Sequence, residues 1–572
     1  MHFIIYPTYE DFFDGPRPDV SELIQEIPNS FIITFVSLCN AELYFSQNEQ
    51  ISQFKLFSKL IERQLPEEKK RLLRLLVTVS RKYNEQFQIF STQNALELLH
   101  RSLIREIKVD EIEDSTPHQE IAILKALLIV SGDFDENFQI AENPINKFDF
   151  FRKSVWPSLI NQLELNNNID YLVEMVLAKM VLDHLQFESE YANYVELFLE
   201  KNNSPNSFTY LFTLSNLINT TRERYSIDNI SPFYIEVEDN LISLFDSLCI
   251  NMSKYQNDYS RQRKHYSGIK ASPLYKFNHN RFLIMDFGLF ARRLYSGLLF
   301  DFYKSSGISM HPKFSKFLDF KNYIGDSCTE NYTLRKVLSA IFSEKHVVKC
   351  FNGDKEGFPD AYIRVGNKIF LFEIKDSFFA SDTVDSYSYD KIASEIDVKY
   401  NCKKKGTGQL VSQLQKLIIT GFEDKPFEES NVKTRNLQIY PILIFTDDFF
   451  GLPGIALYLR EEFERKLPVD IRSSYKKIHS LTFVNIRFFI ENLDLLMNKE
   501  YRLDKIIENN NIQIDKRVIK TEKDFSGDSM ILSKANEGFE SIFYQSYKID
   551  LKRANYIETL FEKLDLRKGL AI

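Results

Sequence analysis

Residues 358–376 read FPDAYIRVGNKIFLFEIKD, which is two β-rich runs joined by the dipeptide Gly366-Asn367. A Gly-Asn pair suits a two-residue hairpin turn whose first residue has a positive φ. Such a turn fixes which residues face each other across the strands, and counting from it places Asp360 directly opposite Glu373. The stretch therefore predicts a β-hairpin that brings two carboxylates together near the end of a sheet.

The charged residues of this hairpin are expected on one face of the sheet. Because side chains alternate along a strand, Lys375 shares a face with Glu373, while Phe370, Phe372 and Ile374 point the other way. Two facing carboxylates repel each other, so their close approach calls for a cation between them. Acids and a lysine that converge on one face, backed by apolar side chains, are typical of a metal-dependent phosphodiesterase site. The alternative is an ordinary surface salt bridge at the end of a sheet, which stabilises little.

Three further segments accompany the hairpin. Apolar residues recur at helical spacing from residue 329 to residue 341, which predicts a helix with an acid in its first turn. Residues 405–414, KGTGQLVSQL, open another helix, on which Gln409 and Gln413 lie one turn apart. Residues 439–446, IYPILIFT, are typical of a strand that extends the same sheet.

Together these segments resemble the PD-(D/E)XK nuclease superfamily, and the resemblance covers roughly residues 320–490. It implies a restriction-endonuclease-like fold of the α+β or α/β class, in which helices flank a mixed β-sheet core. In this superfamily a helical glutamate ahead of the first core strand often completes the metal shell. Glu330 matches that place, and Glu344, at the end of the same helix, is the alternative.

The residue types suit divalent metal chemistry. Asp360, Glu373 and Glu330 are hard oxygen ligands for Mg²⁺ or Mn²⁺, and the resemblance implies the backbone carbonyl of Ile374 as a further ligand. Such a metal activates a water molecule and stabilises the leaving oxyanion. Lys375 is expected to orient or help deprotonate that water and to balance developing negative charge. The pattern is compatible with one metal ion or two.

Many members of the superfamily carry glutamines that face the active site, and Gln409 and Gln413 match them. Two exposed helix glutamines are the alternative. Residues 376–406, which connect Lys375 to this helix, form a longer stretch than is usual in the superfamily. That stretch is either a substrate-contacting insertion or a sign that the glutamine pair is misassigned.

Composition limits the class of protein. A chain of 572 residues should hold two or three domains, and its net charge of −8 argues against a general nucleic-acid coat protein but not against a nuclease. Five scattered cysteines without a Cys-x-x-Cys pair argue against zinc sites and a disulfide framework and favour a reducing cytosol. The longest apolar run, residues 31–39, is too short to span a bilayer, and the N-terminus lacks a basic leader. We therefore expect a cytoplasmic protein with no membrane partner.

Two basic stretches are candidates for contacts with nucleic acid. Residues 251–280 hold six Lys or Arg against one Asp, with four interleaved Tyr, a composition suited to phosphate contacts and base stacking. A solvated linker is the alternative. Residues 403–405 are three lysines just before the glutamine helix, where free backbone N–H groups favour phosphate. They are interpreted as a candidate contact with the DNA backbone.

The expected organisation has four parts. They are a helical domain at residues 1–250, a segment at 251–320 with a basic, aromatic linker and, from about residue 281, an apolar helical pair, the nuclease domain at 321–497, and a C-terminal appendage at 498–572. Six segments of the first part show apolar residues at helical intervals, namely residues 21–27, 50–65, 69–83, 94–107, 120–130 and 169–185. No Gly-x-x-x-x-Gly-Lys-Ser/Thr loop suggests ATP binding. The helical domain is expected to recognise a substrate, a protein partner or a second copy of the chain, or to restrain the nuclease.

These expectations combine into a Mg²⁺-dependent nuclease with a helical N-terminal domain. The resemblance favours DNA over RNA as the nucleic-acid partner, and defence against foreign DNA is a hypothesis consistent with such a fusion. A rival class is a non-catalytic nucleic-acid-binding or scaffold protein that retains the fold. A third interpretation, a purely helical interaction protein that mimics the motif by chance, fails if residues 360 and 373 are adjacent in the structure.

Overall fold

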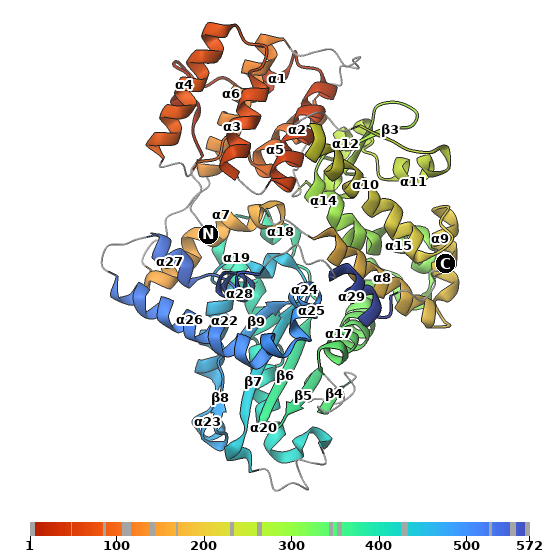
Figure 1. The fold of residues 1–572 in the computed structure, drawn as a ribbon, viewed down its shortest axis with the longest axis vertical. Helices are drawn as coiled ribbons and strands as arrows, with labels where there is room; N and C mark the ends of the chain where they lie inside the picture. The colour runs from red at the N-terminus through yellow and green to blue at the C-terminus, as the bar shows by residue number, and fades with distance from the viewer. Residues whose placement is uncertain are drawn as a thin grey trace.

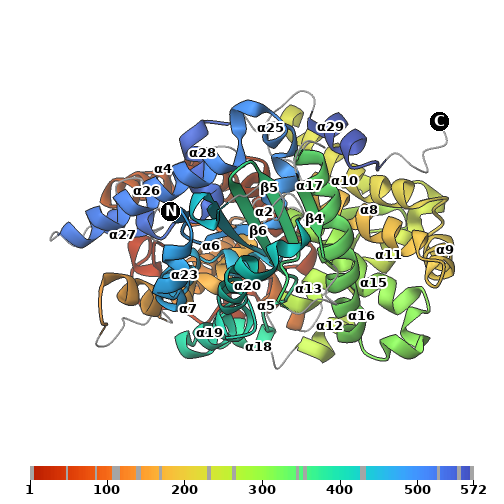
Figure 2. The same ribbon diagram turned by 90° about the horizontal axis from the view of Figure 1, so that it is seen from below.

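The computed structural model describes most of the chain. The described residues are 6–46, 49–83, 87–105, 116–136, 144–166, 170–228, 234–259, 266–342, 347–351, 357–424, 433–524, 529–549 and 556–566. Within them the protein is a mixed α+β molecule with a helical N-terminal half and a mixed six-stranded sheet. The first helices lie at one end of the molecule and the sheet toward the other, with helices around it (Figures 1 and 2).

The N-terminal half is helical, as the apolar periodicity predicts. Its helices are α1 (Val20–Ile24), α2 (Asn29–Phe45), α3 (Glu49–Leu60), α4 (Pro66–Lys82), α5 (Thr92–Ile104), α6 (Pro117–Glu136), α7 (Lys147–Asn166), α8 (Tyr171–Phe187), α9 (Ala192–Lys201) and α10 (Ser207–Asp228). In α4, for example, Leu72, Leu76 and Val79 are buried at helical spacing. Helices α1, α3, α4, α5, α6 and α8 match the six periodic segments, so these predictions are confirmed.

A small three-stranded sheet interrupts the helices of the next segment. The elements are β1 (Ile235–Glu236), α11 (Ile242–Ser247), α12 (Met252–Tyr259), α13 (Ser267–Ala271), β2 (Leu274–Lys276), β3 (Arg281–Ile284), α14 (Phe287–Arg292), η4 (Arg293–Gly297), α15 (Leu298–Ser305), α16 (Phe317–Tyr323), η7 (Ile324–Thr333) and α17 (Leu334–Ile341). The apolar helical pair expected from residue 281 is wrong at its start, because β3 pairs with β1 and β2. Asp286 accepts a hydrogen bond from Leu289 N and caps α14, so the helix begins only after it.

The helix expected at residues 329–341 begins earlier than predicted. Helix α16 continues into η7, a π-helical segment, and then into α17 without a break. The capping contact at the start lies at Lys316, whose N–H donates to Asp319 at 3.2 Å. The prediction that Glu330 lies in a first helical turn is therefore wrong, although Glu330 is in a helical segment.

The six-stranded sheet combines antiparallel and parallel pairs. Its strands are β4 (Val347–Cys350), β5 (Ala361–Val365), β6 (Lys368–Lys375), β7 (Gln438–Phe445), β8 (Lys477–Ile478) and β9 (Thr482–Asn485). Strands β4, β5 and β6 are antiparallel neighbours, while β7 runs parallel to β6, β8 and β9. Val365 pairs with Lys368, and Gly366 has a φ of +60°. The predicted hairpin, its register and the strand at 439–446 are therefore confirmed.

Helices follow β6 and β7 and complete the fold. They are α18 (Ser381–Val384), α19 (Tyr389–Ile396), η8 (Asp397–Asn401), α20 (Thr407–Thr420), α22 (Ile455–Lys466), α23 (Val469–Ser474), α24 (Ile486–Glu491), α25 (Leu493–Leu496), α26 (Leu503–Lys523), α27 (Ser529–Ala535), α28 (Phe539–Tyr547) and α29 (Tyr556–Lys563). The long connection at residues 376–406 thus contains α18, α19 and η8 rather than an irregular loop.

Two hydrophobic cores lie on the two faces of the sheet. Phe370 and Phe372 point into the core that also contains α8, α10 and α14. Ile369 and Leu371 point into the other, with α19, α20, α22 and Trp156 of α7. A third core joins α1 to α6 with Tyr255 and β3, so each of these cores combines side chains from before and after residue 250. In the described part of the chain, we find no helix with the length and apolar character needed to cross a membrane.

Candidate active site

The two carboxylates predicted to face each other are adjacent. Asp360 lies just before β5 and Glu373 near the end of β6, with their carboxyl groups within hydrogen-bonding reach. Ile374 N donates to Oδ2 of Asp360 at 2.7 Å and holds that carboxyl against β6. Glu373 is fully buried, at 0% exposure. A purely helical protein that carries the pattern by chance is therefore ruled out.

Both carboxylate oxygens of Glu373 are bound by neighbouring donors. Lys375 Nζ forms an ion pair with Oε1, and Gln413 Nε2 donates to Oε2 at 2.6 Å. Gln413 comes from α20, which follows a tight turn at Gly406. A Cβ at that glycine would lie 2.0 Å from the carbonyl oxygen of Tyr400, so only glycine fits. The turn brings α20 back to the sheet despite the long connection before it.

Burial and mutual repulsion keep protons on the acid pair. Burial, followed by the charge of Asp360, raises the pKa of Glu373 to about 8. Burial also raises the pKa of Asp360 above its ordinary value, against the opposing effect of Lys375. Burial alone would lower the pKa of Lys375, but the surrounding carboxylates raise it, so the ammonium group stays charged. Near neutral pH the pair therefore retains a proton, because the two acids do not ionise independently.

Glu330 joins this group from η7. Burial, followed by the charge of Asp360, raises the pKa of Glu330 to about 9, and Lys375 and Glu373 also act on it. Asp326, which is exposed and lies earlier in η7, also raises the pKa of Glu330. The sequence-based predictions did not include Asp326. Its separation of four residues from Glu330 is the available signal, because such residues share a helix face.

Asp376 anchors η7 to the strand ends. It directly follows Lys375 and accepts hydrogen bonds from Thr329 Oγ1 at 2.8 Å and Thr446 Oγ1 at 2.7 Å, while Lys321 Nζ lies 2.6 Å from its Oδ2. Burial opposes ionisation, but Lys321 and the two hydroxyl groups lower the pKa of Asp376 below its ordinary value. The predictions missed this residue as well. An acid directly after the Glu-x-Lys triplet, on the apolar face of the strand, is the signal that could have found it.

Three π-helical segments in the described part of the chain border the site. Besides η7, η4 carries Tyr295, whose hydroxyl lies within hydrogen-bonding reach of Thr329. The third, η8, carries Tyr400, whose hydroxyl donates to the carbonyl oxygen of Lys375 at 3.2 Å. Helical turns of this kind are rare and are frequent at functional sites. Their clustering distinguishes the surroundings of the end of β6 from ordinary α-helical structure.

The remaining predicted residues differ in whether they contact the acids. Gln409 is half-buried one turn before Gln413, and among the described residues we find no hydrogen bond from its side chain to the acids. Ile374 lies beside them through its N–H, and the role of its carbonyl as a ligand stays a prediction. Residues 403–405 are exposed before α20. Glu344 lies outside the described residues.

The basic, aromatic stretch at 251–280 is part of the fold, apart from residues 260–265, which lie outside the described residues. Tyr255 and Tyr266 are buried, and their hydroxyl groups bond to side chains of α5 at 2.8 Å and 3.0 Å. Rings enclosed in this way have no face left for a nucleic-acid base. Both interpretations, base stacking and a solvated linker, are therefore wrong for these two tyrosines.

The donor set suits a divalent cation, but the side chains are not arranged around one. Within the described residues, no group of three or more His, Cys, Asp or Glu side chains could hold a metal ion as it stands. In this arrangement Lys375 and Gln413 engage both oxygens of Glu373. The raised pKa values of Glu330 and Glu373 imply that a cation would displace protons here. Gln413 Oε1 is also buried without a hydrogen-bond donor among the described residues, and water on a bound cation would satisfy it.

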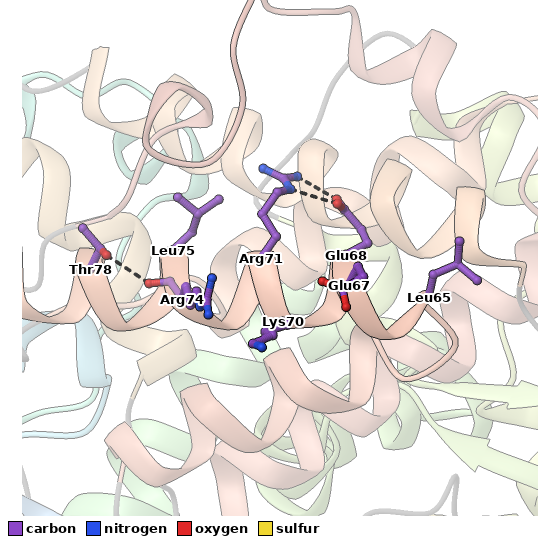
Figure 3. A pocket seen from close by; sticks show the side chains of 8 residues that line it. All are labelled: Leu65, Glu67, Glu68, Lys70, Arg71, Arg74, Leu75 and Thr78. Carbon is purple, nitrogen blue, oxygen red and sulfur yellow. Dashed lines mark hydrogen bonds and ion pairs between the residues drawn. The ribbon is translucent and has the colours of Figure 1, made fainter.

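A separate hollow lies on α4, at the other end of the molecule from the sheet (Figures 1 and 3). Its lining includes Lys70, Arg71 and Arg74. Arg71 pairs with Glu68 at 2.6 Å, and their side chains are 49% and 37% exposed. These groups form the solvated face of one amphipathic helix, and we assign the hollow no chemistry.

Comparisons of the chain with protein-family models, with curated proteins and with solved structures find no match. The residues at the end of β6 are therefore the basis on which a function is inferred.

Proposed function

We propose that this chain is a metal-dependent nuclease of the PD-(D/E)XK type, with a restriction-endonuclease-like core, that hydrolyses phosphodiester bonds. The observation that carries the proposal is the convergence of Asp360, Glu373 and Lys375 with Glu330 and Gln413 at one end of the sheet. Electrostatic perturbation of several neighbouring groups is characteristic of functional sites. DNA is proposed as the substrate in preference to RNA because of the sequence resemblance.

The charges of the site support dependence on a cation. Three carboxyl groups with raised pKa values share one ammonium group, so fully ionised acids would exceed the charge that Lys375 balances. Asp360, Glu373 and Glu330 would hold Mg²⁺ or Mn²⁺, which would supply Lewis-acid activation of the phosphate and a water molecule of lowered pKa. The chain itself orients its acids, because Gln413 donates to Glu373 and the backbone N–H of Ile374 donates to Asp360.

Lys375 is proposed to balance charge on the attacked phosphate. Its side chain is only 18% exposed, so the ammonium group lies in a largely enclosed place beside Glu373. The surrounding carboxylates keep it protonated at neutral pH, so it donates hydrogen bonds and does not act as the initial base. Its role would be to orient the attacking water and to stabilise negative charge in the transition state.

Cleavage assays test the proposal. Linear, circular and single-stranded DNA, and RNA, are incubated with the wild-type protein in Mg²⁺, in Mn²⁺ and in EDTA. We expect metal-dependent cleavage of DNA that falls by about 100-fold or more in Asp360→Asn and Lys375→Ala. The matched controls, Asp470→Asn and Lys520→Ala, change exposed residues and should cleave like the wild type. Absence of cleavage on every substrate in both metals, together with no measurable Mn²⁺ affinity, would refute the nuclease.

The second candidate is a non-catalytic nucleic-acid-binding or scaffold protein with the same core. It is favoured by two observations. Lys375 and Gln413 bind both carboxylate oxygens of Glu373. Among the described residues, no three His, Cys, Asp or Glu side chains are arranged to hold a metal ion. DNA binding without cleavage and without measurable Mn²⁺ affinity would support this candidate. Mn²⁺ binding without cleavage would instead indicate a nuclease that requires a protein partner.

A further inference from the structure

A single buried carboxylate joins η7 to the end of β6. Asp376 accepts a hydrogen bond at 2.8 Å from Thr329, the residue immediately before Glu330. The same Asp376 directly follows Lys375 in the chain. Asp376, which is next to Lys375 in the chain, is therefore bonded directly to Thr329, which is next to Glu330.

Asp376 is itself held from other sides. Thr446, just after β7, donates to its second oxygen at 2.7 Å, and Lys321 Nζ lies 2.6 Å from the first. The side chains of Lys321 and Asp376 are only 4% and 3% exposed. A Cβ at Gly325 would lie 3.4 Å from the Cβ of Asp376, so the start of η7 packs closely against it. A buried carboxylate with this many partners has a fixed position.

A second contact joins η7 to the helical N-terminal half of the protein. Ser327 Oγ lies 2.9 Å from Nε2 of His184 on α8, so η7 is held between α8 and the strand ends. Among these contacts, the hydrogen bond from Thr329 is the one that ties η7 to the strand that carries Glu373 and Lys375. The position of Glu330 relative to these two residues should therefore depend on that bond.

We propose that Asp376 is a positioning residue that, through Thr329, holds η7 so that Glu330 stays beside Glu373 and Lys375. The inference rests on the proposed function, because the placement of Glu330 matters to activity only if these acids hold a cation. Asp376 is assigned no contact with metal or substrate. Groups that orient metal ligands typically change metal affinity by about 10–100-fold when they are removed.

Substitutions at Thr329 isolate the hydrogen bond. Thr329→Val keeps the shape of the side chain and removes the hydroxyl, and Thr329→Ser restores it. Two variants are controls. Thr446→Val removes the other hydroxyl donor to Asp376. Tyr295→Phe removes the tyrosine hydroxyl that lies within hydrogen-bonding reach of Thr329. Asp376→Asn is not used, because it leaves the buried Lys321 without its partner charge and destabilises the whole region.

Two measurements are made on each full-length variant: Mn²⁺ affinity by calorimetry, and amide hydrogen exchange of residues 324–333. For Thr329→Val we expect an Mn²⁺ affinity about 10-fold or more below that of the wild type, with faster exchange in η7. Thr329→Ser and both controls should remain within about twofold of the wild type in Mn²⁺ affinity.

An unchanged Mn²⁺ affinity in Thr329→Val overturns the proposal, whether or not exchange in η7 changes. An equal loss of affinity in Thr446→Val or Tyr295→Phe also overturns it, because the effect would then be a general loosening. If the wild type binds no Mn²⁺, the proposed nuclease function fails instead. Exchange then decides the anchoring alone: faster exchange only in Thr329→Val supports it, and any other result overturns it.

Discussion

Lys375 forms an ion pair with Glu373, two residues earlier on the same strand, beside the carboxyl group of Asp360. The ammonium group neutralises part of an acidic cluster that would otherwise be too costly to bury. Each of these residues therefore affects both the stability of the fold and the proposed chemistry, and the two effects can be measured separately.

Replacing Lys375 with Met should destabilise the protein more at alkaline pH than at acidic pH. Lys375 opposes the rise that burial imposes on the pKa of Glu373, which is about 8 in the wild type, so without Lys375 the folded state resists ionisation of this acid still further as the pH rises. The free energy of unfolding should therefore fall by about 1–2 kcal/mol more at pH 9 than at pH 6. Urea denaturation at both pH values measures this, with the exposed Lys520→Met as control. An equal effect at both pH values would contradict the ion pair.

Glu330→Gln should become more stable than the wild type as the pH rises. The unfolded chain ionises this glutamate near 4.5, whereas the folded protein holds the proton to about pH 9. Between these values the folded wild type binds more protons than the unfolded chain, so its free energy of unfolding falls with rising pH. A glutamine at this position cannot ionise, so the free energy of unfolding of the Glu330→Gln variant does not fall with rising pH in this way. Thermal denaturation from pH 5 to pH 9 should show the two proteins diverging, and Glu196→Gln, an exposed control, should follow the wild type. Parallel profiles would contradict the burial of Glu330.

Gln413→Leu should weaken both the site and the fold. Its amide is the donor to Oε2 of Glu373, and removing a group that orients a metal ligand typically reduces activity by about 10–100-fold. Loss of the buried hydrogen bond should also cost about 1–2 kcal/mol of stability. Gln415→Leu changes an exposed glutamine on the same helix and is the matched control. Similar cleavage rates for the two variants would contradict the role of Gln413.

The ion pair between Arg487 on α24, which directly follows β9, and Glu174 on α8 should couple the helical N-terminal half to the part of the fold that contains the sheet. Arg487 Nη2 lies 2.6 Å from Oε1 of Glu174 on α8, and Glu174 is 0% exposed. Glu174→Ala leaves the buried guanidinium with fewer partners and should destabilise the protein by about 3 kcal/mol. A double-mutant cycle with Arg487→Met measures the coupling, with Glu196→Ala as an exposed control. Additive effects of the two substitutions would show that the pair is not coupled.

The hairpin could be predicted because the information for it is local. Gly366-Asn367 sets the turn, and the alternation of IFLFEIK sets which side chains share a face, so the adjacency of Asp360 and Glu373 follows from counting. The long apolar periods of the N-terminal helices were equally informative. Gln413 was identified from its place on a helix, although the sequence could not show that it, rather than Gln409, donates to Glu373.

Features that depend on distant partners were missed. Asp376 is kept ionised by Lys321 and bonded by Thr446, which is 70 residues away, and its place after the Glu-x-Lys triplet marks the residue without revealing these partners. The sequence likewise gives no signal for the π-helical geometry of η7. Asp326 was not considered because the helix was expected to begin only at residue 329. Strand β3 is too short for its alternation to be distinguished from a helix, and its pairing with β1 and β2 determines its conformation.

Calorimetric titration of the protein with Mn²⁺ at pH 7, in two buffers of different ionisation enthalpy, tests most directly whether these acids form a metal-dependent site. We predict that Mn²⁺ binds and releases protons, because Glu330 and Glu373 hold theirs to about pH 9 and about pH 8. Glu373→Gln should abolish the binding. No binding by the wild type, or binding that releases no protons and persists in Glu373→Gln, would contradict the assignment of these acids as the active site.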